Sequence, residues 1–161
     1  MKKSNKGFTL IELLVVVVLI GILGGISALS IRALSSTSAK SCAAEINSLI
    51  SKCRVSSLSR TGDVYITIYM KDGKVIGSYS DGKQTETKTL SDGRAVVSYK
   101  VGTITSNLGA EPGLKLSFDR STGGLKPQSG GSDYCKAIFV AGGGKTYTID
   151  IASSTGNHSI S

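Results

Sequence analysis

The chain has no tryptophan, one histidine and two prolines among its 161 residues. Large aromatic side chains are few, with three Phe and six Tyr, whereas glycine occurs twenty times. A chain of this length accommodates one domain, so we expect a modest core and a fold rich in turns.

Catalytic residues are scarce. A nucleophile with a general base would need His158, which lies in a turn near the carboxyl terminus, where a lone histidine is generally solvated. Asp72, Asp81 and Asp92 each precede a glycine, and turn chemistry accounts for them. Gly142–Thr146 lacks the Walker spacing and lies among strands rather than before a helix, so we interpret it as a hairpin. We expect no enzyme activity, no catalytic residues and no cofactor.

Cysteine occurs three times. Cys42 and Cys53 lie on one predicted helix, about 16 Å apart at a rise of 1.5 Å per residue, so they cannot bridge each other. In an oxidising compartment, a bond from Cys53 or Cys42 to Cys135 would join the helix to the later sheet, with Cys53–Cys135 as our candidate pair. Three buried free thiols are the alternative. No cysteine pair has ligand spacing, so no metal site is expected.

Charge is absent from Leu13 to Ile31, although Glu12 directly precedes this run. The segment from Phe8 to Ile31 is long enough to span a bilayer, which needs roughly 20 residues. An ionised side chain in hydrocarbon costs roughly 2.5–3.5 kcal/mol. Either Glu12 is solvated at the membrane edge, or a partner charge meets it inside the membrane; the apolar residues before Glu12 favour the second interpretation.

Basic residues precede the apolar run. Lys2, Lys3 and Lys6 predict a cytoplasmic amino end by the positive-inside rule, which puts the chain after Arg32 outside the cytoplasm. The formal charge of the whole chain is +8, of which these lysines supply three. The remaining excess is scattered along the sequence.

The pattern of apolar residues predicts one long helix from Phe8 to about Leu58. Beyond Arg32 apolar side chains recur every three or four residues, so one face must be buried, and the following sheet is its expected partner. From Asp63 onward the period is two, with turn signals about every ten residues. The predicted strands are 64–70, 75–80, 85–90, 94–101, 114–118, 137–140, 147–151 and 158–160, and the polar segment 126–133 is predicted to be an exposed loop.

The segment Lys6-Gly7-Phe8-Thr9-Leu10-Ile11-Glu12 resembles the leader junction of type IV prepilins and type II secretion pseudopilins. The resemblance implies that a prepilin peptidase cleaves between Gly7 and Phe8 and methylates the new amino terminus at Phe8. It also implies that Glu12 neutralises the terminal amine of a neighbouring subunit during assembly. Many members carry a proline where this chain has Leu29, so we expect a straighter helix here or a bend at Gly24–Gly25.

Later features resemble the GspH/FimT group of minor pseudopilins. These features are a strand ending at Phe118, a Thr122–Gly123 turn, a polar loop, Ile149–Ile151 and a Thr155–Gly156 turn before the last strand. The expected class is α+β, a helical spine packed by its second half on a small antiparallel sheet or sandwich. The expected division is 1–7 leader, 8–31 transmembrane and filament-core helix, 32–60 amphipathic half and 61–161 β domain.

We expect a structural minor pilin or pseudopilin of a type IV pilus or type II secretion pseudopilus. Its partners would be other subunits in a helical filament, prepilin peptidase and the assembly platform of the inner (cytoplasmic) membrane. The protein would first be a single-pass membrane protein and then part of an extracytoplasmic filament. The alternative is a DNA-binding minor pilin of a natural transformation apparatus, which would contact phosphates through basic residues. The turn from Thr155 to Ser159 contains no Lys or Arg.

Overall fold

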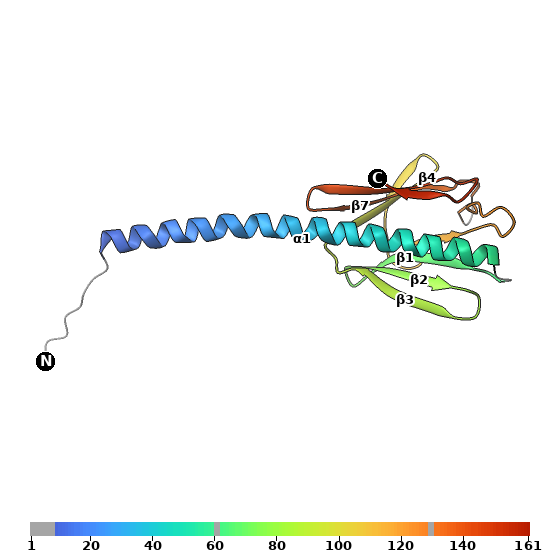
Figure 1. Ribbon diagram of the computed structural model, residues 1–161, viewed down its shortest axis with the longest axis horizontal. Helices are drawn as coiled ribbons and strands as arrows, with labels where there is room; N and C mark the ends of the chain where they lie inside the picture. The colour runs from blue at the N-terminus through green and yellow to red at the C-terminus, as the bar shows by residue number, and fades with distance from the viewer. Residues whose placement is uncertain (1–8, 60–61, 129–130) are drawn as a thin grey trace.

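The computed structural model describes residues 9–59, 62–128 and 131–161, and within the helix the side chains of residues 24–30 lie outside this description. The fold is α+β. One helix, α1 (Leu10–Ser59), extends well beyond a domain of antiparallel strands (Figure 1). The predicted fold class is therefore confirmed, as is the predicted long helix over its described residues.

The two halves of α1 have different surroundings. The first half projects away from the β domain, while the second half lies along it (Figure 1). Six apolar side chains of the second half have no exposed surface, in agreement with the predicted amphipathic pattern. They are Ala39, Cys42, Ala43, Ile46, Ile50 and Cys53. Burial of a large aliphatic side chain contributes about 1.5–3 kcal/mol, so this face holds the helix on the domain.

The first sheet contains four strands in the order β3-β2-β1-β6. Their bounds are β1 (Tyr65–Lys71), β2 (Lys74–Ser80), β3 (Thr85–Ser91) and β6 (Leu114–Ser117). The predicted β1–β2 hairpin is confirmed, because Asp72 and Gly73 have φ angles of 50° and 72°. Positive φ at both positions is the geometry of a type I′ turn, which suits the twist of paired strands.

The second sheet contains five strands in the order β5-β4-β7-β8-β9. Their bounds are β4 (Val96–Val101), β5 (Ile104–Asn107), β7 (Cys135–Gly142), β8 (Lys145–Ile151) and β9 (His158–Ile160). Strand β5 was not predicted. It is a short edge strand, and its side chains are mostly exposed, so it lacks the alternation that identifies a half-buried strand.

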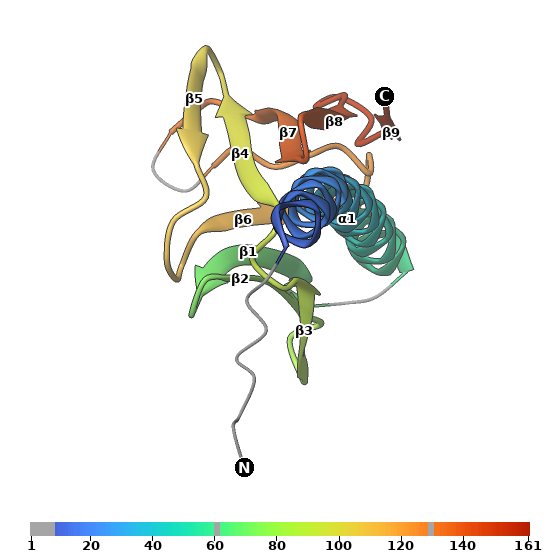
Figure 2. The same cartoon turned by 90° about the vertical axis from the view of Figure 1, so that its left-hand side faces the viewer.

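The core lies between the two sheets and α1. Viewed along the helix, one sheet lies above α1 and the other below it, and the sheets diverge toward the helix (Figure 2). Ile46 and Ile50 of α1 belong to the same buried cluster as side chains from both sheets. The fully or almost fully buried large members of that cluster in the strands include Ile66, Ile68, Leu114, Leu116, Ile138, Val140 and Ile149.

The β7–β8 hairpin contacts the helix where α1 enters the domain. A methyl group at Gly143, whose φ is 61°, would overlap the carbonyl oxygen of Arg32 and lie 2.7 Å from the amide nitrogen of Ser36. At the neighbouring Gly142, it would lie 2.5 Å from the carbonyl oxygen of Ser35. The backbone of the hairpin therefore packs directly on the backbone of α1. We call this region, which comprises α1 residues 31–38, the hairpin and the β3–β4 connection, the neck.

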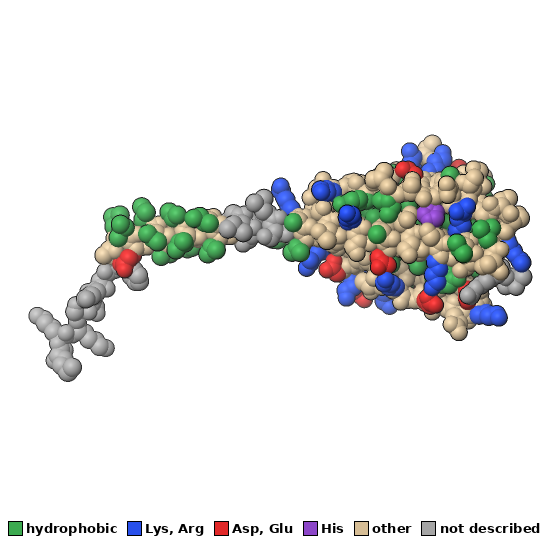
Figure 3. All heavy atoms as spheres, in the orientation of Figure 1, with side chains coloured by type: hydrophobic (Ala, Val, Ile, Leu, Met, Phe, Trp, Pro, Cys, Tyr) green, Lys and Arg blue, Asp and Glu red, His purple; other side chains and the backbone are tan. Residues whose placement is uncertain are grey.

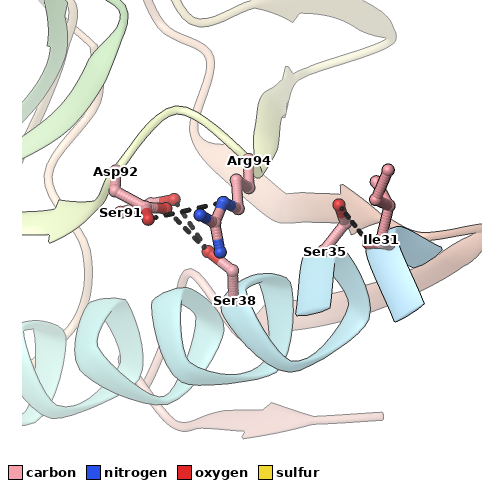
Figure 4. A network of polar contacts seen from close by, with 6 residues as sticks. All are labelled: Ile31, Ser35, Ser38, Ser91, Asp92 and Arg94. Atoms are coloured by element: carbon pink, nitrogen blue, oxygen red, sulfur yellow. Dashed lines mark hydrogen bonds and ion pairs between the residues drawn. The ribbon is translucent and has the colours of Figure 1, made fainter. Parts of the chain in front are cut away.

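Polar contacts fix the other side of the neck (Figure 4). The Ser38 hydroxyl donates to Asp92 Oδ1 at 3.2 Å and lies 3.3 Å from the Ser91 hydroxyl. Arg94 Nε lies 3.6 Å from Asp92 Oδ2. The two contacts of Ser38 thus join α1 to the end of β3 and to the β3–β4 connection, and the ion pair lies within that connection.

Candidate functional site

The exposed half of α1 is the most unusual surface of the molecule. Each large apolar side chain described from Leu10 to Leu23 is at least 49% exposed. These residues occupy successive positions, so they cover every face of the helix, and Figure 3 shows those on one side of it. Apolar surface of this extent is unfavourable in water and marks a site of contact with another protein or with a membrane. This half of α1 is therefore the candidate site.

The predicted membrane segment, 8–31, includes residue 8 and the side chains of 24–30, which lie outside the described part of the structure. Within the described part, no helix combines the length and the apolar character needed to cross a membrane.

The start of α1 forms a capping box around Thr9 and Glu12. The Thr9 backbone N–H and hydroxyl donate to Glu12 Oε2 at 2.9 and 2.8 Å, and the Glu12 N–H donates to Thr9 Oγ1 at 3.4 Å. These bonds satisfy donors at the helix start that have no partner inside the helix. A carboxylate here also interacts favourably with the positive end of the helix dipole.

Only one oxygen of the Glu12 carboxylate takes part in the capping box. Within the described residues, Oε1 accepts no hydrogen bond. Glu12 borders an open hollow of about 370 Å³ on one side of the helix, whose other lining residues are Ile11, Val15 and Val16. The site therefore combines an apolar contact surface with one acceptor that is still available to a donor from another molecule.

The sequence contains a signal for this cap that our predictions did not use. A Thr-x-x-Glu pattern directly before an apolar run is the signature of a capping box. We considered for Glu12 either solvation at the membrane edge or a role between subunits, whereas the structure also gives it a partner in its own chain.

Residues 2–28 match the family described as the prokaryotic N-terminal methylation motif. This match supports a type IV pilin-like leader and, in general terms, a relationship to pilins and pseudopilins. No curated protein and no solved structure is significantly similar to the chain. Membership of the GspH/FimT group stays a prediction. Gly7 and Phe8, the predicted cleavage and methylation positions, lie outside the described residues.

The three cysteines are buried free thiols. The disulfide predicted between Cys53 and Cys135 is not formed in this structure, although both side chains belong to the same core cluster. Burial raises the pKa of each thiol, including that of Cys42, to about 12. All three are therefore protonated at neutral pH and contribute to the core as small apolar side chains.

We expect these thiols to resist alkylation by iodoacetamide in the native protein at pH 8 and to react fully in denaturant, with mass spectrometry as the measurement. The pKa of each thiol is higher in the folded state than in the unfolded state. Unfolding therefore releases protons at pH values above the usual thiol pKa. The stability should therefore be insensitive to the thiols below about pH 9 and should fall as the pH rises from 9 toward 12. Rapid native alkylation would contradict this expectation.

His158 is not the solvated residue that the sequence suggested. Its ring is partly buried, with Nε2 2.7 Å from the Ser51 hydroxyl of α1 and Nδ1 3.0 Å from the Gly156 carbonyl oxygen. The residue helps to attach β9 to the helix. No local pattern indicates this contact, because Ser51 lies 107 positions away.

Two basic side chains that could contact DNA, Lys52 and Lys88, form ion pairs within the domain. Lys52 contacts Glu86 at 2.5 Å and lies 4.3 Å from the centre of the Tyr79 ring, while Lys88 contacts Glu45 at 2.8 Å. Both ion pairs join α1 to β3. They are partly exposed, so each contributes at most about 1 kcal/mol.

Proposed function

We propose that the protein is a structural pilin-like subunit, a minor pilin or pseudopilin, that is inserted in the cytoplasmic membrane and then incorporated into a helical filament. The observation that carries the proposal is the apolar half of α1, which is exposed on all sides and begins with a single carboxylate. The methylation motif over residues 2–28 supports the same function.

In the proposed mechanism, prepilin peptidase removes residues 1–7 and methylates the new terminus at Phe8. Residues 8–31 then exchange lipid contacts for contacts with equivalent helices in the filament core, where close packing holds the subunits together. Glu12 binds the terminal amine of a neighbouring Phe8, which compensates the carboxylate and sets the stagger between subunits. The β domain, 61–161, lies outside this core on the amphipathic half of the helix, 32–60.

The partners in this proposal are other pilin or pseudopilin subunits, prepilin peptidase and the assembly platform of the cytoplasmic membrane. The filament would be a type IV pilus or a type II secretion pseudopilus. Assembly into either filament would bury the exposed apolar surface of α1 between helices, so this surface supports both assignments.

The first test is the mass of the amino-terminal peptide of protein expressed with and without a prepilin peptidase. We expect a peptide that begins at Phe8 and carries one additional methyl group only when the peptidase is present. A Gly7→Val variant serves as the control and should keep the full leader, because a branched side chain replaces the residue before the predicted cleavage point. A chain that begins at Met1 in the presence of an active peptidase would refute the proposed processing.

A further inference from the structure

A concave pocket of about 420 Å³ lies in the β domain, away from the candidate assembly site. Its walls come from the loop after β6 and from the turn between β8 and β9. Both segments lie at the end of the molecule opposite the exposed half of α1 (Figure 1). The main lining residues are Asp119, Lys126, Pro127, Tyr134, Ser153 and Ser154.

The two walls of the pocket are fixed to each other. The Leu125 N–H donates to the Ser153 carbonyl oxygen at 2.8 Å. A methyl group at Gly124 would lie 2.7 Å from the carbonyl oxygen of Ser154, so the two backbones are in close contact. The pocket is therefore formed before any ligand binds, which lowers the entropic cost of binding.

Asp119 is held in one orientation by its own loop. Its Oδ1 accepts hydrogen bonds from the amide and hydroxyl of Ser121, at 3.0 and 2.6 Å, and from the amide and hydroxyl of Thr122, both at 3.0 Å. These bonds, the Ser121 hydroxyl foremost, hold the pKa of Asp119 well below its usual range. Within the described residues Oδ2 accepts no hydrogen bond, so a fixed, ionised carboxylate retains one acceptor.

The lining chemistry selects the class of ligand. Asp119 accepts hydrogen bonds only, and Lys126 donates only, whereas a hydroxyl group does both. A phosphate would be attracted by Lys126 but repelled by Asp119, and an organic cation would experience the reverse. Pro127 and the ring of Tyr134, which is 36% exposed, add apolar surface for the carbon skeleton of a ligand.

We propose that this pocket binds a neutral sugar unit, with Asp119 and Lys126 hydrogen-bonded to its hydroxyl groups and Tyr134 against its apolar face. The volume lies within the range of small-molecule sites, about 300–1,000 Å³. This binding is independent of filament assembly. In the proposed filament, it would occur on the outer domain rather than in the helical core.

The test uses the full chain, labelled with ¹⁵N, in dodecylphosphocholine micelles, because this detergent carries no sugar head group. The protein is titrated with glucose, galactose, mannose and N-acetylglucosamine, and with inorganic phosphate and ethylammonium as charged comparators. For at least one neutral sugar we expect saturable changes in amide chemical shifts confined to residues 119–126, 134 and 152–156. The expected dissociation constant is on the order of 1 mM, which is typical of a small ligand with few contacts.

Variants make the assignment specific. Lys126→Gln and Tyr134→Ala should each weaken sugar binding by about 5-fold or more while the α1 amide shifts stay unchanged, since both side chains are at the surface. Asp119→Asn should also weaken it, whereas Asp72→Asn, at the distant β1–β2 turn, should not. Absence of saturable shifts, shifts located elsewhere, tighter binding of phosphate or ethylammonium, or full binding by both Lys126→Gln and Tyr134→Ala would each overturn the proposal.

Discussion

Glu12→Gln should leave membrane insertion intact and reduce incorporation into the filament on the order of 100-fold. In the variant the neighbour's terminal ammonium loses its partner, and an unpaired ionised group in hydrocarbon costs roughly 2.5–3.5 kcal/mol, where 1.4 kcal/mol corresponds to a factor of ten. The neutral amide inserts more easily than the carboxylate, but it cannot form an ion pair with a neighbour's terminal amine. The measurement is the ratio of subunit in sheared filaments to subunit in membranes, by quantitative immunoblotting.

Thr9→Val separates the two roles of Glu12. This variant removes the hydroxyl that donates to Glu12 Oε2 and leaves the carboxylate in place. If the intermolecular ion pair governs assembly, Thr9→Val should destabilise the start of the helix by only about 1 kcal/mol, the contribution of the cap. The variant subunit should then still be incorporated into the filament at most of the normal level. Equal losses for Glu12→Gln and Thr9→Val would mean that the carboxylate acts only as a cap. Glu45→Gln, on the same helix, controls for the loss of one negative charge.

Gly143→Ala should destabilise the β domain by about 2–4 kcal/mol, whereas Gly144→Ala should cost about 1 kcal/mol. Both residues have positive φ angles, 61° and 81°, so both substitutions introduce similar backbone strain. Only at Gly143 does the added methyl group meet the backbone of Arg32 and Ser36, and at Gly144 nothing lies within 4 Å. The difference between the two variants therefore measures the neck contact itself.

The appropriate measurement is urea unfolding of the full chain in micelles, followed by tyrosine fluorescence because the chain contains no tryptophan. Tyr147 follows the substituted hairpin and packs against the core, so the signal reports on the affected sheet. Similar losses of unfolding free energy for both variants would show that the hairpin does not depend on its contact with α1.

Local patterns predicted much of the fold. The recurrence of Ala39, Ile46 and Ile50 along the sequence identified the buried face of α1, and the Asp72–Gly73 pair identified the first hairpin, because each depends on neighbouring residues alone. Strand β5 escaped detection because its exposed side chains show no alternation. The arrangement of strands in two sheets around the helix also depends on contacts between distant segments, which no short pattern contains.

The candidate functional residues also fall into those that local sequence patterns indicate and those that only the fold brings together. Glu12 stands out in sequence because it interrupts an apolar segment, and its bonds with Thr9 follow from a spacing of three residues. The pocket at Asp119 was not predicted, since Tyr134 and Ser153 reach it from different parts of the chain. The loop that contains Asp119 was interpreted only as a turn. The structure shows in addition that Ser121 and Thr122 donate to Oδ1 and that, within the described residues, Oδ2 accepts no hydrogen bond.

The single helix also has a mechanical consequence. Its 50 residues extend about 75 Å at 1.5 Å per residue, and the buried side chains from Ala39 to Cys53 lie along its second half. A pull on the exposed half is directed along the helix axis and loads the helix–sheet contact in shear. The successive apolar contacts, the neck and the ion pairs with β3 then carry the force together rather than one after another, so the domain should withstand tension best in this direction.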